Sequence, residues 1–167
     1  IGITDIYLSP ILKAKSGSPH GYDVTDPGAI NPELGTEEDL GAIAQHLKQC
    51  GMGMIVDFVP NHMCISDPEN VWWRDVLENG PSSPFAQFFD IDWNPPRENL
   101  TNKVLLPILD RQYGKALEEQ KIVISYSAGS FQLVLDGVVL PVNPRTWPLI
   151  LQPALESLVA ELGESNA

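Results

Sequence analysis

Positive charge is scarce in this chain. Its 167 residues include 22 Asp and Glu but only 10 Lys and Arg, which gives a formal net charge of −12. Binding to nucleic acid or to an anionic membrane surface calls for clustered basic side chains, so the composition argues against both partners. A neutral polar ligand such as a sugar fits better, although net acidity by itself also serves solubility.

Cysteine and long apolar runs are nearly missing as well. Cys50 and Cys64 form no disulfide framework and have no metal-ligating neighbours at a useful spacing, which predicts a reduced, cytoplasmic protein. No apolar stretch is long enough to cross a bilayer. The first residues, IGITDIYLSP, have neither an initiator Met nor the features of a signal peptide, and they read as a strand cut from a longer chain.

A strand–helix–strand pattern is present in the first third of the chain. Apolar, β-rich runs at 3–8 and 54–59 flank a helix that Thr36 caps and Gly51 ends. One face of this helix carries the apolar residues Leu40, Ile43, Ala44 and Leu47. Such a unit is typical of a parallel α/β sheet. The intervening stretch 11–35, rich in Gly, Pro, Ser and Asp, predicts a long ordered loop.

The remainder predicts a mixed, partly antiparallel region. A short helix should end at Gly80, and another should lie at about 112–120. The alternating runs KIVISY and FQLVLDG, joined by SAGS, predict a hairpin. A last helix should begin with Pro153 in its first turn.

An acidic residue interrupts the second apolar run. In MIVDFVPNHM, residues 54–63, Asp57 lies among apolar neighbours, where a lone carboxylate is costly unless it is paired or hydrogen-bonded. Pro60 stops the strand, and Asn61 and His62 follow at the carboxyl end, where parallel sheets bind ligands. The pattern indicates either a polar site or a structural ion pair for Asp57 with a capping role for Asn61.

A second polar cluster occurs in PHGYDVTD, residues 19–26, which should lie at the same rim of the sheet. It contains His20, Tyr22, Asp23 and Asp26. A tyrosine ring suits stacking on a sugar, because its face meets C–H groups while its hydroxyl stays in water. The alternative is a packed loop in which Tyr22 is buried and Asp26 caps a turn.

Aromatic residues form a third group, either a carbohydrate platform or, as is more common for such stripes, part of a core: Trp72, Trp73, Phe85, Phe88, Phe89 and Trp93. The sequence has no glycine-rich phosphate loop and no CxxC, HExxH or GxSxG motif.

HGYDV and DFVPNH together resemble the first conserved segments of the α-amylase superfamily, glycoside hydrolase family 13. Its Asp-x-x-x-Asn-His signature, at the end of the third barrel strand, reads Asp57 to His62 here. IYLSPILKAKSGSPHGYDVTDPGAINPELG and ENVWWRDVLENGPSSPFAQFFDIDWNP are similar to the maltooligosyltrehalose synthase family within it. The resemblance covers nearly the whole chain and is strongest over residues 1–113.

The resemblance implies an α/β fold class: a fragment of a (β/α)8 TIM barrel around strands 2–3, with an inserted mixed α+β B domain. Residues 1–63 would belong to the barrel and residues 64–150 to the B domain. Residues 151–167 would be a helix returning toward the barrel.

The implied activity is an intramolecular transglycosylation of trehalose biosynthesis, an isomerase reaction of carbohydrate metabolism. It turns the reducing-end α-1,4 linkage of a maltooligosaccharide into an α,α-1,1 linkage, without a cofactor. Both catalytic carboxylates would lie on later strands, so the resemblance implies no catalytic residue here and an inactive fragment. No metal site is implied. Substrate binding would fall to His20, Tyr22, Asp57 and His62, with Asp23 and Asn61 in support.

Two other functions stay open. One is an α-1,4-glucan hydrolase of the same superfamily, and the other is a non-catalytic glucan-binding module. A barrel arc with only two parallel strands also has unpaired edges, which predicts that copies of the chain associate through them.

Overall fold

The computed structural model describes residues 2–164, with side chains as far as residue 161. It divides into two compact units, residues 1–71 and 72–167, and each is described by itself. The three-part domain division expected from the sequence stays a prediction.

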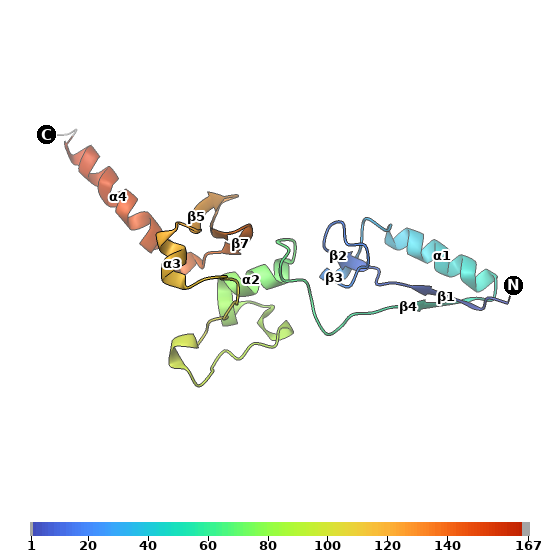
Figure 1. Ribbon diagram of the computed structural model, residues 1–167. Helices are drawn as coiled ribbons and strands as arrows, with labels where there is room; N and C mark the ends of the chain where they lie inside the picture. The colour runs from blue at the N-terminus through green and yellow to red at the C-terminus, as the bar shows by residue number, and fades with distance from the viewer. Residues whose placement is uncertain (1, 165–167) are drawn as a thin grey trace. The chain divides into compact units, whose positions relative to one another are not determined.

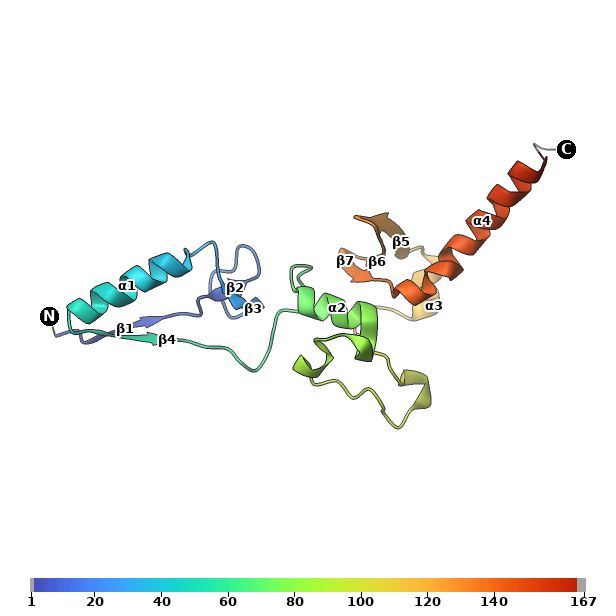
Figure 2. The same cartoon turned by 180° about the vertical axis from the view of Figure 1, so that it is seen from behind.

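The first unit is built on one parallel strand pair. β1 (Asp5–Leu8) pairs with β4 (Gly53–Val56), and Tyr7 lies opposite Ile55 and Leu8 opposite Val56. α1 (Glu37–Gln49) connects the two strands and runs alongside them in both views (Figures 1 and 2). The predicted strand–helix–strand unit with parallel strands is therefore confirmed.

The signals that set the ends of α1 act as expected. Thr36 Oγ1 accepts the N–H of Asp39 at 3.2 Å, and the Asp39 carboxylate accepts the N–H of Thr36 at 2.9 Å, which completes a reciprocal capping box. Gly51 follows the helix with φ of 69°. On the predicted apolar stripe, Leu47 is buried, whereas Ile43 is 47% exposed.

The prediction of a long loop at residues 11–35 is wrong. The chain forms an antiparallel hairpin there, β2 (Leu12–Ala14) against β3 (Val24–Ile30), beyond the carboxyl ends of β1 and β4 (Figures 1 and 2). Pro27 and Gly28 lie inside β3, and the pairing shifts register twice along its length. Such irregular strands tolerate the residues that argue against regular sheet. The hairpin supplies the core of this unit, with Val24 2% exposed.

The predicted strand at 54–59 is too long. β4 ends at Val56, so Asp57 follows the strand and does not lie inside a core. Its N–H still donates to Leu8 O at 2.9 Å, one step past the ladder, and its side chain is only half-buried. The carboxylate escapes the cost of deep burial because it lies at the open end of the strand pair.

All but the first residue of α2 (Val71–Asn79) belongs to the second unit, and the helix lies close to the one predicted before Gly80. Trp73 is 9% exposed on its inner face and Val76 is fully buried. Short 3₁₀ helices follow at Gly80–Ser82, Ala86–Phe88 and Glu98–Leu100, and α3 (Tyr113–Glu118) confirms the predicted short helix.

A three-stranded antiparallel sheet contains the predicted hairpin and one strand more. β5 (Ile122–Ser127) and β6 (Ser130–Leu135) match KIVISY and FQLVLDG, and β7 (Val138–Pro141) was not predicted. Two-residue turns join them, Ala128–Gly129 and Asp136–Gly137, and all four turn residues have positive φ. This is the backbone of a type I′ turn, which matches the twist of paired strands.

The last helix starts earlier than predicted. α4 spans Trp147–Glu164, so Pro153 lies inside it and not in its first turn. A 3₁₀ turn at Pro144–Thr146, capped by the Asn143 side chain on Arg145 N at 2.9 Å, leads directly into the helix. Trp147 anchors its start by donating from Nε1 to Val142 O at 3.1 Å. Among the described residues, no helix combines the length and apolar composition that crossing a bilayer requires.

We expect Thr36→Ala to destabilise α1 by about 1 kcal/mol, because an N-cap side chain lost to alanine leaves a backbone donor unpaired. Amide hydrogen exchange across residues 37–49 measures this loss. Thr36→Ser keeps the cap oxygen and serves as the control. Equal protection in Thr36→Ala and in the unchanged chain would show that the capping box does not stabilise the helix.

Candidate functional site

The carboxylate of Asp57 accepts hydrogen bonds from two phenols. Tyr7 and Tyr22 each donate their hydroxyl to Oδ2 of Asp57 at 2.5 Å. The partners are 50 and 35 residues away in the chain. Tyr7 is 63% exposed and Tyr22 is 41% exposed, so this polar cluster is open to solvent. The structure thus joins the two predicted residues, Tyr22 and Asp57, and adds a third.

Strand register brings Tyr7 to Asp57. Tyr7 lies opposite Ile55 in the parallel pair, and side chains two residues apart on a strand share a face. Asp57 is two residues after Ile55, so it lies on the face that Tyr7 occupies, one step further along. A shift of one residue in this pairing would turn Tyr7 to the opposite face.

A tight turn brings Tyr22 to the same carboxylate. Gly21 has φ of 77°, and a Cβ at this position would lie 2.6 Å from Pro10 O, so only glycine fits. Ser18 Oγ accepts the Gly21 N–H at 3.1 Å and donates to Asp23 Oδ1. Ser18 and Asp23 lie on either side of Tyr22 in the sequence, and these hydrogen bonds hold the turn that carries the tyrosine.

The hydrogen bonds shift the ionisation of all three groups. The donors Tyr22 and then Tyr7 hold the pKa of Asp57 below its ordinary value. The same bonds raise the pKa of Tyr22, and raise the pKa of Tyr7 to about 12. Ionised Asp57 therefore stabilises the folded state above its ordinary pKa, and this contribution is lost as the pH falls through the lowered folded-state value.

His20 lies beside Tyr22, and the hydrogen bond to its ring determines which ring nitrogen can donate. Its Nδ1 accepts the Tyr22 N–H at 3.0 Å, whereas Asp23 Oδ1 is 3.8 Å from the same nitrogen, which is too far for a hydrogen bond. The neutral ring then carries its proton on Nε2. The rings of His20 and Tyr22 have centroids 5.8 Å apart. His20 can therefore offer one N–H to a neutral acceptor next to the tyrosine face.

Asn61 and His62 contact each other, with Asn61 Oδ1 3.2 Å from His62 Nδ1. Within the part of the chain that the structure describes, no hydrogen bond joins either side chain to Tyr22 or Asp57. The backbone on both sides is tethered, by Asp57 N to Leu8 O and by Cys64 N to Val24 O at 2.7 Å. His62 therefore lies on a short segment whose two ends are held by backbone hydrogen bonds.

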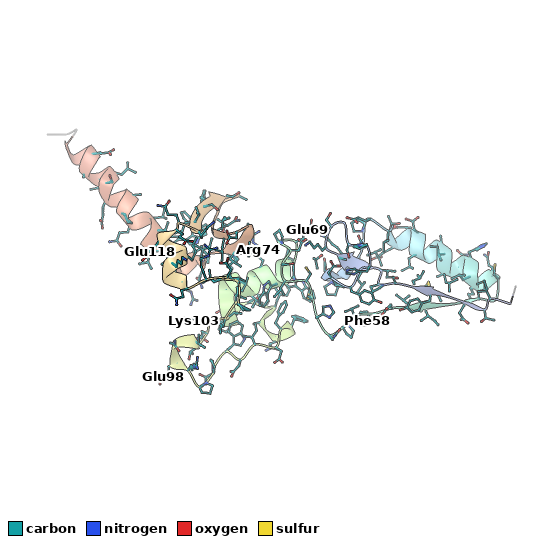
Figure 3. All side chains as sticks on the ribbon, viewed as in Figure 1. Phe58, Glu69, Arg74, Glu98, Lys103 and Glu118 are labelled. Carbon is teal, nitrogen blue, oxygen red and sulfur yellow. The ribbon has the colours of Figure 1, made fainter. Side chains whose placement is uncertain are left out.

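An ion pair holds the chain just after this segment. Lys13 Nζ of β2 lies 2.9 Å from Glu69 Oε2, and Glu69 is labelled in Figure 3 together with Phe58, the residue that follows Asp57. Phe58 is 63% exposed. The strand β2 thus secures the far end of the stretch that carries Asn61 and His62.

A cavity of this unit adjoins the Asp57 cluster without including its carboxylate. It has a volume of about 310 Å³ and a mostly apolar lining, which includes Leu8, Ile30, Leu40, Ile43 and His20. Neither Tyr22 nor Asp57 lines it. Sugar recognition needs convergent polar groups, and these lie at the phenol–carboxylate cluster.

The remaining predicted groups have other roles. Asp26 Oδ1 accepts the Gly28 N–H at 2.8 Å and so caps a turn. In the second unit, Trp72 stacks on Phe85 with centroids 5.3 Å apart, and Phe88 is 64% exposed. The aromatic group is therefore part core and part surface. Among the side chains that the structure describes, no three of His, Cys, Asp or Glu gather as a metal site would require.

Sequence reasoning missed Tyr7 and Ser18. The signal for Tyr7 is its position, second from the end of a strand whose parallel partner ends just before Asp57. The signal for Ser18 is its spacing, five residues before Asp23 across a Pro–His–Gly turn.

Comparison with known proteins identifies the family. The model of the α-amylase catalytic domain matches residues 1–121. The chain belongs to the α-amylase family. The predicted fold class is confirmed: part of a (β/α)8 barrel, with the β1–α1–β4 unit, followed by a mixed α+β region.

Individual α-amylase relatives narrow the comparison. The chain is 49% identical over 110 residues to a putative maltooligosyl trehalose synthase of Mycobacterium tuberculosis, covering 65% of this chain and 14% of the relative. It is 36% identical over 91 residues to an intracellular maltogenic amylase of Bacillus subtilis, covering 54% of this chain and 15% of that one. The structure of maltooligosyltrehalose synthase from Arthrobacter ramosus aligns with a TM-score of 0.70 at 34% identity. That alignment covers 86% of this chain and 18% of the other.

We expect Asp57→Asn to lower the pKa of Tyr7 from about 12 toward the ordinary phenol value, and to lower that of Tyr22 as well. The hydrogen bond to the carboxylate retains the phenol proton and the carboxylate charge opposes phenolate formation. The amide removes that charge and weakens the bond while keeping the shape. Ring-carbon NMR titration of the tyrosines measures the change. Asp26→Asn, which removes a carboxylate of the same unit that binds Gly28 N and neither tyrosine hydroxyl, is the matched control. Unchanged phenol titration in Asp57→Asn would contradict the assigned hydrogen bonds.

Proposed function

We propose that this chain is part of an enzyme that converts the reducing-end α-1,4 linkage of a maltooligosaccharide into an α,α-1,1 linkage. The proposal rests on the 49% identity to a putative maltooligosyl trehalose synthase, against 36% to the maltogenic amylase. The 34% identity and TM-score of 0.70 to the Arthrobacter ramosus enzyme support it. The chain spans 14% of the first relative's length, so the activity belongs to the longer protein.

The reaction is an isomerisation by double displacement. A carboxylate attacks the anomeric carbon of the penultimate glucose while an acid protonates the oxygen of the departing reducing-end glucose. The 1-hydroxyl of that same glucose then attacks the anomeric carbon of the glycosyl intermediate, which releases the carboxylate, and gives its proton to the conjugate base. This chemistry needs two carboxylates about 5 Å apart. Neither is assigned to this chain, so the 167-residue chain alone has no turnover.

The assigned residues bind and orient the sugar. Tyr22 presents its half-exposed ring to the glucose where the bond is cut, with its hydroxyl anchored on Asp57. His20 donates Nε2–H to a sugar hydroxyl, and His62 contributes a second polar contact from its tethered segment. Asp57 and Asp23 keep their charge and orient the catalytic groups by accepting from an arginine of the longer protein. Asn61 supports the loop through His62.

The cellular setting follows from the proposed reaction. The enzyme is an isomerase of trehalose biosynthesis and carbohydrate metabolism, needs no cofactor, and has a maltooligosaccharide as its partner. Cys50 and Cys64 are both free, which supports the reducing cytoplasm as its location.

The second candidate is an α-1,4-glucan hydrolase, and the similarity of the chain to the maltogenic amylase of Bacillus subtilis supports it. The same binding residues serve both reactions, because hydrolysis differs only in the second acceptor, water in place of a sugar hydroxyl. A non-catalytic glucan-binding module is disfavoured, because the cluster in this chain is open to solvent and would leave a bound sugar largely exposed.

Incubating the full-length enzyme with maltopentaose separates these functions. We expect reducing ends to disappear without release of glucose, and NMR of the product to show an α,α-1,1 linkage. The 167-residue chain run in parallel is the control and should convert nothing. A rise in reducing ends assigns a hydrolase and overturns the proposal. Conversion by the chain alone would contradict the absence of catalytic carboxylates from it.

We also infer that copies of the 167-residue chain associate through the free edges of β1 and β4. Analytical ultracentrifugation should show oligomers that Val56→Lys weakens, because a charge beside a bare edge opposes strand pairing. Gln45→Lys, at an exposed position of α1, is the control and should leave association unchanged. A compact monomer at high concentration would contradict this inference.

A further inference from the structure

Two phenols converge on one oxygen of Asp57, and they differ in the part of the fold that carries them. Tyr7 belongs to β1, whose position is set by the hydrogen-bonded pairing with β4. Tyr22 belongs to the turn held by Gly21 and Ser18. Side chains on strands are positioned more accurately than side chains on loops. Tyr7 is therefore the more rigid of the two donors.

The Asp57 carboxylate needs such a donor. Its side chain is only half-buried, so packing alone does not determine the rotation of its terminal torsion, which has a broad energy profile. The 2.5 Å contact from Tyr7 selects the orientation in which Oδ2 also meets the Tyr22 hydroxyl. Charge-assisted hydrogen bonds of this type are among the stronger ones in proteins.

We propose that Tyr7 is a positioning residue: through Asp57 it anchors the Tyr22 hydroxyl and so sets the angle at which the Tyr22 ring meets the sugar. Tyr7 acts at one remove from the sugar, because its hydroxyl is committed to Asp57. The inference rests on the proposed function and deepens it by adding a residue to the same site.

The proposal is tested by a double-mutant cycle in the full-length enzyme, with Tyr7→Phe, Asp57→Asn and the double variant. Phenylalanine keeps the ring and removes only the donated hydroxyl. We expect Tyr7→Phe to lower kcat/KM about tenfold in the unchanged enzyme, the size expected for a hydrogen bond to a charged group. In the Asp57→Asn background the same change should cost less than about twofold, because residues that act through one another are not additive.

A matched control excludes a general effect of removing a phenol hydroxyl. Tyr126 is 64% exposed, against 63% for Tyr7, and it contacts Phe131 through its ring. Tyr126→Phe should leave kcat/KM unchanged in both backgrounds. Equal, additive losses from Tyr7→Phe with and without Asp57 would overturn the proposal, and so would no loss at all.

A second measurement keeps this inference separate from the proposed function. The carboxyl carbon of Asp57 is titrated by NMR in the 167-residue chain and in its Tyr7→Phe variant. We expect the Asp57 transition to move to higher pH when the Tyr7 hydroxyl is removed, and an unmoved transition overturns the proposal. If the full-length enzyme hydrolyses maltopentaose, the proposed function fails. The double-mutant cycle then uses kcat/KM for hydrolysis, so the inference about Tyr7 is still tested.

Discussion

The parallel register of β1 and β4 is the constraint on which the candidate site depends. It aligns Tyr7 with Ile55, and the next residue on that face is Asp57. One more side chain, Tyr22 from the connection between β2 and β3, completes the cluster. Because side chains alternate along a strand, a slip of one residue would separate the phenol from the carboxylate and dismantle the site at once. The helix α1, with its caps, forms the connection between these two strands.

Asp57 keeps its negative charge through hydrogen bonds from two phenols and not through an ion pair. Both partners of Asp57 are neutral hydroxyls, and they lower its pKa by hydrogen bonding. An ion pair would neutralise the carboxylate, whereas two phenol hydrogen bonds leave its negative charge in place. Around it, His20 offers an N–H and Tyr22 a half-exposed ring. Neutral donors and an aromatic face suit a sugar, which also agrees with a chain that carries few basic residues.

The sequence predicted most strongly what short-range rules determine. The capping box at Thr36 and the positive φ at Gly51 mark α1 correctly, because each signal acts within one turn of helix. Asp57 and Tyr22 were predicted as site residues because their chemistry is conspicuous, and the structure joins them by a hydrogen bond. Tyr7 was not, since its role depends on pairing with a strand nearly 50 residues away, which no local period reveals. β7 could have been found, because the Asp136–Gly137 turn that precedes it is a strong hairpin signal.

The most direct test of the account is a crystal structure of the full-length enzyme with a bound maltooligosaccharide. We expect the hydroxyls of Tyr7 and Tyr22 both to lie within hydrogen-bond distance of one Asp57 oxygen, and a glucose ring to lie against the face of Tyr22. A structure in which Asp57 contacts neither phenol, or in which the sugar binds away from Tyr22, would contradict it.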